Sequence, residues 1–140
     1  AQYAAELECF RDAADNLDLV ILNPSICIGD GAVVPSGRAL SKLDGDAPIS
    51  VVDVSAAASA HLDAVETLHF GERVILTGEN TTIGALRDGL HADGEGGHRL
   101  WGYQVEVCDQ IDELRHGQLF TNGCHLDASK ARREFGFAPD

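Results

Sequence analysis

Apolar residues recur at helical spacing near the start of the chain. Tyr3, Leu7, Phe10, Ala14 and Leu17 fall on one face of a helix, and charged residues occupy the other side. The pattern predicts an amphipathic helix whose apolar stripe packs against a sheet and belongs to the core.

A short aliphatic run follows this helix and breaks its period. Leu19–Leu22 is typical of a strand buried on both faces, and Pro24 ends it because proline cannot donate to a sheet. Open α/β sheets place their ligands beyond strand ends of this kind. No period persists from Ala32 to Ile49, so we expect a long loop with a short helix near Arg38–Leu43.

The rest of the chain alternates short strands with helices. We predict strands at Ile49–Val54, Arg73–Thr77 and Tyr103–Cys108, and helices at Ala56–Leu68, Thr81–His91 and Asp127–Phe135. Asp53 or Ser55 caps the first of these helices, because a side-chain oxygen accepts a backbone N–H that the helix leaves without a partner. The order of elements predicts an α/β protein with one domain, residues 1–140.

Charge and cysteine content narrow the range of partners. The formal net charge is −13, which argues against nucleic acid and anionic membranes as partners because both would repel the chain. The four cysteines show no C-x-x-C spacing, so we predict no metal site and expect reduced thiols. With no long apolar span and no signal-peptide pattern, we expect a cytoplasmic protein.

Four segments occur in a specific order along the chain. They are the Asn-Pro-Ser that follows Leu19–Leu22, then Val51–Leu62, Gly71–Gly78 and Leu126–Phe137. Together they resemble the extended short-chain dehydrogenase/reductase family, in particular its dihydroflavonol-reductase, cinnamoyl-reductase and fungal aldehyde-reductase group. The resemblance implies the C-terminal, substrate-side half of that fold, a partial Rossmann-like arrangement of short parallel strands and flanking helices.

The same resemblance identifies family features that the chain lacks. The chain contains no G-x-x-G-x-x-G, the family's dinucleotide-binding loop. In the family a helix that reads Ser-Lys-x-x-Ala-Glu adjoins the catalytic Tyr-x-x-x-Lys motif, and alignment of Ala1–Glu6 with this helix puts Gln2 at the position of its lysine. Tyr3 is therefore not the family's catalytic tyrosine, and Ala56 replaces the second Asp of the VDV-x-D segment. We expect no cofactor, with NADP bound only if another segment supplies the missing half.

The Leu19–Leu22 strand would have neighbours in the complete family fold that this chain does not provide. A buried-type strand with an open edge exposes N–H and C=O groups and invites pairing with another chain. We expect a homodimer through that edge, a repacked fold, or a complex with a reductase-like chain that carries the other half.

The turn after this strand supplies the first candidate site residues. The resemblance implies that residues at this position lie beside the nicotinamide and the substrate. Asn23 and Ser25 are therefore candidate hydrogen-bonding groups, and Ile26 with Cys27 is a candidate apolar wall.

The remaining candidates come from later segments. Asp53 follows an apolar run, and a buried carboxylate there would have a raised pKa suited to acid–base chemistry, with helix capping as the alternative. His61 matches the family's Ala-His, where the role is mainly structural. Trp101, Tyr103 and Phe120 lie in the family's variable substrate-side region and supply either aromatic binding surface or core.

These observations leave three functions open. The first is a truncated reductase-like protein that binds a small apolar or polycyclic ligand; as an enzyme it would promote isomerisation, cyclisation or elimination without a cofactor. The second is a fragment or subunit of an NAD(P)-dependent carbonyl reductase or sugar epimerase. The third is a non-enzymatic binding partner of an intact homologue.

Overall fold

The computed structural model describes residues 2–15, 17–67, 71–110 and 124–139. The fold is mixed α/β, with parallel and antiparallel strand pairs and flanking helices. In chain order the elements are α1 (Gln2–Ala14), β1 (Ile21–Pro24), β2 (Ile26–Ile28), β3 (Val33–Pro35), α2 (Gly37–Leu40), β4 (Pro48–Asp53), α3 (Val54–Thr67), β5 (Arg73–Leu76), β6 (Glu79–Thr82), α4 (Ile83–Gly89), β7 (Leu90–Ala92), β8 (His98–Leu100), β9 (Tyr103–Cys108) and α6 (Ser129–Phe135).

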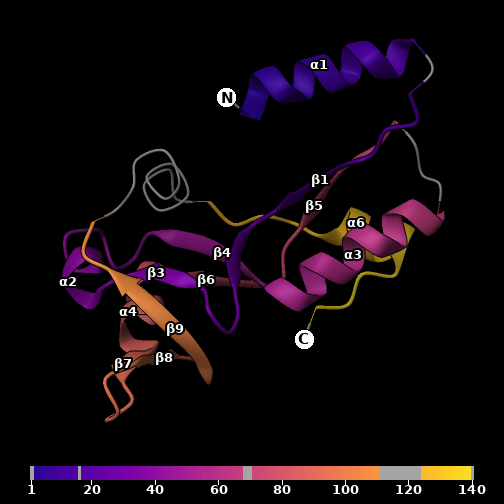
Figure 1. Cartoon of the computed structure of the whole chain (residues 1–140). Helices are drawn as coiled ribbons and strands as arrows, with labels where there is room; N and C mark the ends of the chain where they lie inside the picture. The colour runs from indigo at the N-terminus through magenta and orange to yellow at the C-terminus, as the bar shows by residue number, and fades with distance from the viewer. Residues whose placement is uncertain (1, 16, 68–70, 111–123, 140) are drawn as a thin grey trace.

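The strands form three small sheets. β1 pairs with β5 in parallel, β4 lies between parallel β2 and antiparallel β6, and β9 lies between parallel β3 and the antiparallel β8–β7 hairpin. Figure 1 shows β1, β5, α3 and α6 in one half of the molecule and β3, β9, β8, β7, α2 and α4 in the other. β4 and β6 extend between the two halves, so the same strands position side chains on both sides.

Small residues build the core of the first half. Ala57, Ala60 and Ala64 of α3 are buried in one apolar cluster with Ala131 and Phe135 of α6 and with residues of β5. Alanine on both helices allows their backbones to approach closely. α6 then ends at Gly136, whose φ of 64° is the left-handed conformation that favours glycine.

Larger aliphatic side chains build the core of the second half. Leu40 of α2, Ile49 of β4, Leu86 of α4 and Leu100 of β8 are almost completely buried in a second cluster. Thr82 starts α4 by accepting the Ala85 N–H on its side-chain oxygen, in the way expected for a threonine N-cap. This cluster packs the β8–β9 hairpin against α4 and so fixes the position of the turn that joins β8 to β9.

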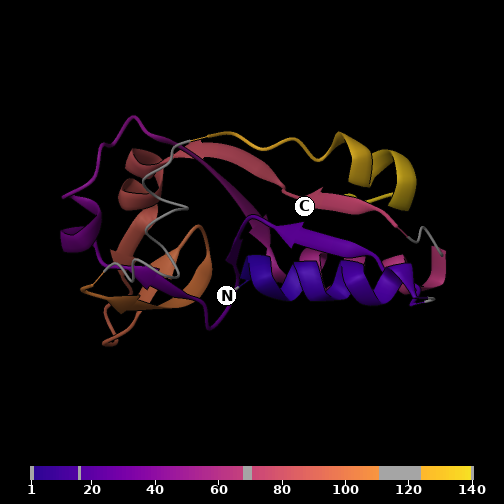
Figure 2. The same ribbon diagram turned by 90° about the horizontal axis from the view of Figure 1, so that it is seen from above.

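α1 forms where the sequence predicts it, but its apolar stripe does not enter the core. Tyr3 is 74 % exposed and Phe10 is 40 % exposed, and Leu7 is also exposed. Figure 2 shows the helix lying along β1, and its contact with β5 includes the Glu6–Arg73 ion pair and Arg73 over the Phe10 ring. The prediction of a core stripe is wrong because the β1–β5 sheet has two strands among the described residues and offers too little surface to cover the helix.

Several short elements differ from the sequence prediction. The predicted loop at Ala32–Ile49 contains β3, and its helix is one turn at Gly37–Leu40. α4 ends at Gly89, so His91 belongs to β7. β2, β6, β7 and β8 were not expected, because strands of three or four residues are too short to show a period. Over the described ranges, no helix has both the length and the apolar character needed to cross a membrane.

Candidate functional site

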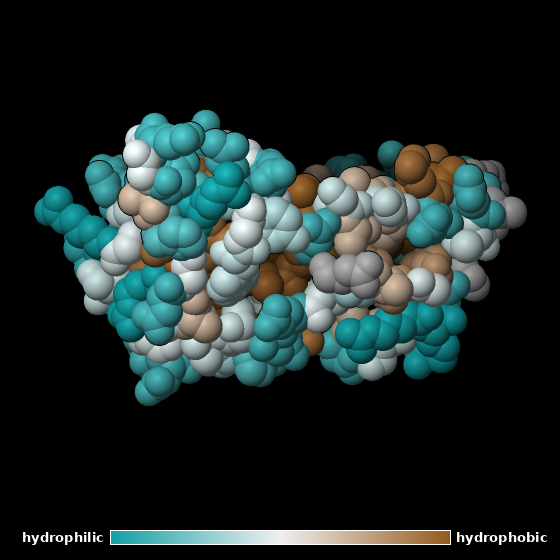
Figure 3. Space-filling view, turned by 90° about the horizontal axis from the view of Figure 1, so that it is seen from below, coloured by the Kyte–Doolittle hydropathy of each residue, from teal (hydrophilic) through white to brown (hydrophobic). Residues whose placement is uncertain are grey.

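A cavity of about 540 Å³ opens between β4, β6, α4 and the turn that joins β8 to β9. Figure 3 shows apolar surface recessed near the middle of the lower face, between the two halves of the molecule. The lining residues are Ile28, Val51, Val52, Asp53, Gly78, Glu79, Thr81, Ala85, Trp101, Tyr103 and Pro139. Its wall is thus partly aliphatic and aromatic, with a few polar groups among them, as is usual for a small-molecule site.

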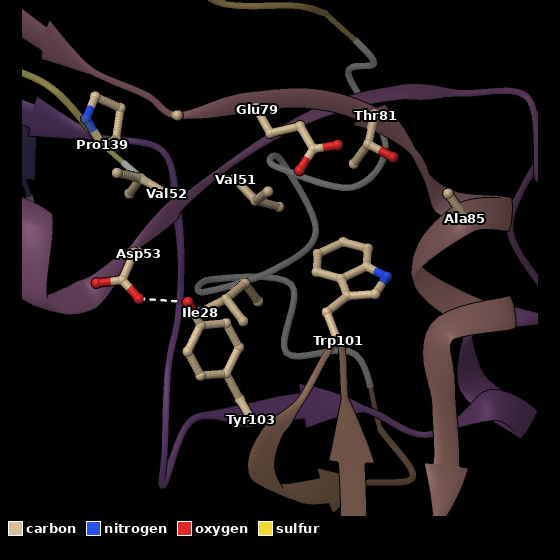
Figure 4. Close-up of a pocket in the computed structure, with 11 residues that line it drawn as sticks. Ile28, Val51, Val52, Asp53, Glu79, Thr81, Ala85, Trp101, Tyr103 and Pro139 are labelled. Carbon is tan, nitrogen blue, oxygen red and sulfur yellow. Dashed lines mark hydrogen bonds between the residues drawn. The ribbon is translucent and has the colours of Figure 1, made fainter.

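Asp53 and Tyr103 join the two sides of the cavity. The Tyr103 hydroxyl donates a hydrogen bond to Asp53 Oδ2 at 2.5 Å, as Figure 4 shows. Asp53 Oδ1 accepts the backbone N–H groups of Ser55 and Ala56 at 2.8 and 3.1 Å. Asp53 is therefore the N-cap of α3, one of the two residues predicted for that role, and its second oxygen also connects the start of that helix to β9.

The hydrogen bond moves the two pKa values in opposite directions. It is the main reason that the pKa of Asp53 lies below its ordinary value, and the backbone donors add to the effect. The same bond is the main reason that the pKa of Tyr103 lies above its ordinary value, with burial and the charges of Asp53 and Asp30 adding to it. The expected raised pKa of Asp53 is wrong, because hydrogen bonds to the ionised form outweigh its partial burial. Near pH 7 the pair is a stable carboxylate and a stable phenol.

Trp101 reaches the cavity from a two-residue turn. Leu100 pairs with Tyr103, so Trp101 and Gly102 form the tip of the β8–β9 hairpin, and both have positive φ, 49° and 90°. Asn-Gly is favoured in such turns, and a bulky residue in the first position is strained. The ring lies against the end of α4, where a Cβ added to Gly89 would be 2.3 Å from Trp101 Nε1. Trp101 remains 39 % exposed, so its ring is accessible from the cavity.

Glu79 and Thr81 complete the polar lining, and the sequence reasoning missed both. They are two residues apart on β6, so their side chains leave the same face of the strand. Figure 4 shows both side chains extending from β6 toward Trp101. The polar stretch Glu79–Thr82 gives no apolar strand signal, and the sequence analysis assigned Thr81 to the start of the following helix, whereas the structure places it in β6.

Two other predicted site residues lie at a different place. Asn23 and His61 line a second cavity of about 690 Å³ between α1, β1 and α3. His61 Nδ1 is 2.7 Å from the carbonyl oxygen of Ala57 one turn earlier, which supports the structural role that the sequence allowed. Asp53 lines the cavity beside Trp101 and not this second cavity. The predicted catalytic residues therefore do not form one group.

The other predicted residues near β2 do not line either cavity. Ser25 is 5 % exposed, and its Oγ has no hydrogen-bond partner among the described residues. Ile26 packs on the second core, and Cys27 is exposed. Burial of its sulfur nevertheless raises the pKa of the Cys27 thiol, which makes it a poor nucleophile. Phe120 lies outside the described residues.

Comparison with known proteins identifies a fold but no family. No family model matches the chain, and no curated protein matches it. Among solved structures, "Crystal structure of gox2253" matches 98 % of this chain at 22 % identity with a TM-score of 0.61, and 49 % of its own chain is covered. "X-ray structure of Pal from Bacillus thuringiensis" matches 89 % at 11 % identity with a TM-score of 0.50, with 41 % of its own chain covered. The chain thus spans half or less of the length of each.

Among residues 2–15, 17–67, 71–110 and 124–139, no group of three or more histidine, cysteine, aspartate or glutamate side chains is arranged to hold a metal ion.

Proposed function

We propose that this chain is the substrate-side part of a reductase-like protein and that it binds a small apolar or polycyclic ligand. The observation that carries the proposal is the cavity of about 540 Å³ beside Trp101 and Tyr103. Aliphatic residues give it an apolar floor, and Asp53, Glu79 and Thr81 supply a few polar groups at its edge. This combination suits recognition of a largely apolar molecule through shape and a small number of hydrogen bonds.

The partial coverage of a larger solved structure and the sheet arrangement support the proposal that this chain is part of a longer α/β fold. Nearly all of the chain superposes on about half of a larger solved structure, as expected for one part of a longer fold. The parallel pairs β1–β5 and β2–β4 are compatible with a partial Rossmann-like arrangement, to which antiparallel β6 and the β8–β7 hairpin are additions. The four family-like sequence segments point in the same direction.

The chemistry of the cavity favours binding over proton transfer. A general acid or base works best with a pKa near the working pH. The pKa of Asp53 is lowered and that of Tyr103 is raised, so both move away from neutrality. A cofactor-free isomerisation, cyclisation or elimination at this site would therefore depend on ligand orientation and hydrogen bonding, with little contribution from proton exchange with this pair.

The second function, a part of an NAD(P)-dependent carbonyl reductase or sugar epimerase, is compatible with the partial coverage of the matched structures. The chain covers 49 % of one matched structure and 41 % of the other, which leaves room for a second half that holds the cofactor. In that case NADP and the proton-donating groups would come from another segment or chain. Calorimetry with NADPH tests this: no binding by the chain alone but binding after addition of a co-purifying reductase-like chain supports the second function.

The binding proposal can be tested through the intrinsic fluorescence of the protein. The chain contains one tryptophan, so its emission reports on Trp101 directly. Titration with uncharged polycyclic compounds, beginning with adamantylmethanol, should give a saturable change in emission. Ala85→Leu fills the cavity from α4 and should weaken binding at least tenfold, whereas Ala58→Leu places the same side chain on the exposed face of α3 and should not. No saturable change with any compound, or equal binding by both variants, would overturn the proposal.

A further inference from the structure

The charged groups that line the cavity beside Trp101 are all acidic. Asp53 and Glu79 line it, and no lysine, arginine or histidine does so among the described residues. Asp30 adds negative charge close to Tyr103, where it contributes to the raised pKa of the phenol. The guanidinium of Arg99, on the same hairpin as Trp101, donates to the Gly102 carbonyl at 3.2 Å and is not part of the lining. An anionic ligand would meet repulsion from these carboxylates, with no compensating cation among the described lining residues.

The two acidic side chains are not equally available to a ligand. Both oxygens of Asp53 already accept hydrogen bonds, from Tyr103 and from two backbone N–H groups. Glu79 is exposed, and no described residue donates a hydrogen bond to its carboxylate or forms an ion pair with it. Figure 4 shows this carboxylate directed from β6 toward the Trp101 ring. Within the part of the chain that the structure describes, Glu79 is therefore the acidic group with free acceptor capacity.

Trp101 supplies an independent argument for a ligand at the same place. A bulky residue at φ 49° is strained, and such strain persists where the surrounding structure imposes it, often at binding sites. Here it keeps a partly exposed indole in the cavity. Among aromatic rings, indole binds cations best through its π-face. A carboxylate without a partner among the described residues, opposite an accessible indole, is the arrangement that recognises an ammonium group.

We infer that the ligand of this cavity is a cationic amine, an apolar or polycyclic body with an ammonium group that contacts Glu79 and the Trp101 ring. The apolar body occupies the floor near Ile28 and Val51. The inference rests on the proposed function, because it assigns a ligand class to the same cavity. It predicts that neutral analogues bind more weakly than the amine and that anionic analogues bind least.

Three probes that share the adamantane cage and differ in charge test, at pH 7, whether the cavity prefers a cationic ligand. Adamantylmethylammonium, adamantylmethanol and adamantanecarboxylate do not absorb where tryptophan is excited, so Trp101 emission can follow each titration. We expect the ammonium compound to bind about tenfold more tightly than the alcohol, and the carboxylate to bind most weakly. Higher salt should reduce the affinity for the ammonium compound and leave that for the alcohol unchanged.

Two variants that each remove one negative charge test whether Glu79 causes the preference for the ammonium compound. Glu79→Gln should lower the affinity for the ammonium compound to about that of the alcohol, with little change for the alcohol itself. Glu106→Gln removes the same charge from an exposed position on β9 outside the cavity and should change neither affinity by more than about twofold. Binding of the alcohol as tightly as the ammonium compound, or equal effects of both variants, would overturn the inference while leaving the proposed function standing. Failure of all three probes to bind would overturn both.

Discussion

The hydrogen bond between Tyr103 and Asp53 is the feature whose removal gives the clearest prediction. Tyr103→Phe deletes the hydroxyl and keeps the ring, so the wall of the cavity retains its shape. Hydrogen bonds to charged groups contribute about 1.5–3 kcal/mol, and solvent competition at half-buried side chains reduces that contribution. We expect a loss of about 1 kcal/mol in the free energy of unfolding, which corresponds to a melting temperature lower by about 3–5 °C.

The effect of Tyr103→Phe should depend on pH in a defined way. The pKa of Asp53 is lowered in the folded state, so its contribution is complete above the unfolded value near 3.9 and is lost as pH falls through the folded value. The pKa of Tyr103 is raised, so its contribution is complete below about 10 and is lost as pH rises through the folded value. The difference between wild type and Tyr103→Phe should therefore be constant from about pH 5 to 9 and shrink on both sides.

The assay is urea unfolding followed by far-UV circular dichroism, with a double-mutant cycle. Asp53→Asn retains an N-cap side chain for α3 and removes the charge that Tyr103 contacts. The coupling between the two substitutions should be about 1 kcal/mol at pH 7 and smaller at pH 3. Tyr3→Phe is the matched control, because Tyr3 is 74 % exposed on α1. A coupling near zero at pH 7, or one that does not change with pH, would refute this account of the pair.

Three further pairs of substitutions test the core, the turn and a helix end. Leu86→Ala should lower the free energy of unfolding by about 3 kcal/mol in chemical denaturation because the side chain is buried, whereas Leu62→Ala at a 71 % exposed position should change it by less than about 0.5 kcal/mol. Gly89→Ala should displace the indole and shift the wavelength of tryptophan emission; Gly37→Ala, with open space around its added Cβ, should not. Gly136→Ala should cost about 1 kcal/mol at φ 64°, and Gly136→Asn should restore much of that loss in thermal unfolding.

The sequence predicted the longer elements because their patterns are local. The helical spacing at the start of the chain, the apolar strand at Arg73–Thr77 and the short helix that ends at Phe135 were each predicted without knowledge of their neighbours. The N-cap role of Asp53 also follows from its position just before a helix. Its bond to Tyr103 does not, because a contact across fifty positions depends on how β9 is placed.

The candidate site was only partly predictable for a related reason. Trp101 and Tyr103 were candidates for aromatic binding surface or for core, but Glu79 was not a candidate, since β6 is defined by pairing with β4 and not by its own polar sequence. The exposure of Phe10 could not be predicted for the same reason, because it depends on how other elements are placed. A helical stripe indicates that apolar surface needs a partner, yet the sequence alone does not say whether the chain contains that partner.

The distribution of strain indicates which of the two cavities holds the function. Both ends of the short helices follow local rules where Thr82 caps α4 and Gly136 ends α6. At the cavity between the two halves they are broken, because a tryptophan occupies a turn position suited to asparagine and a glutamate side chain faces an indole without a described partner. The cavity near His61 shows no such conflict, since the ring is satisfied by a carbonyl of its own helix. Natural chains depart from local rules mainly at functional sites, so the conflict at Trp101 favours the first cavity.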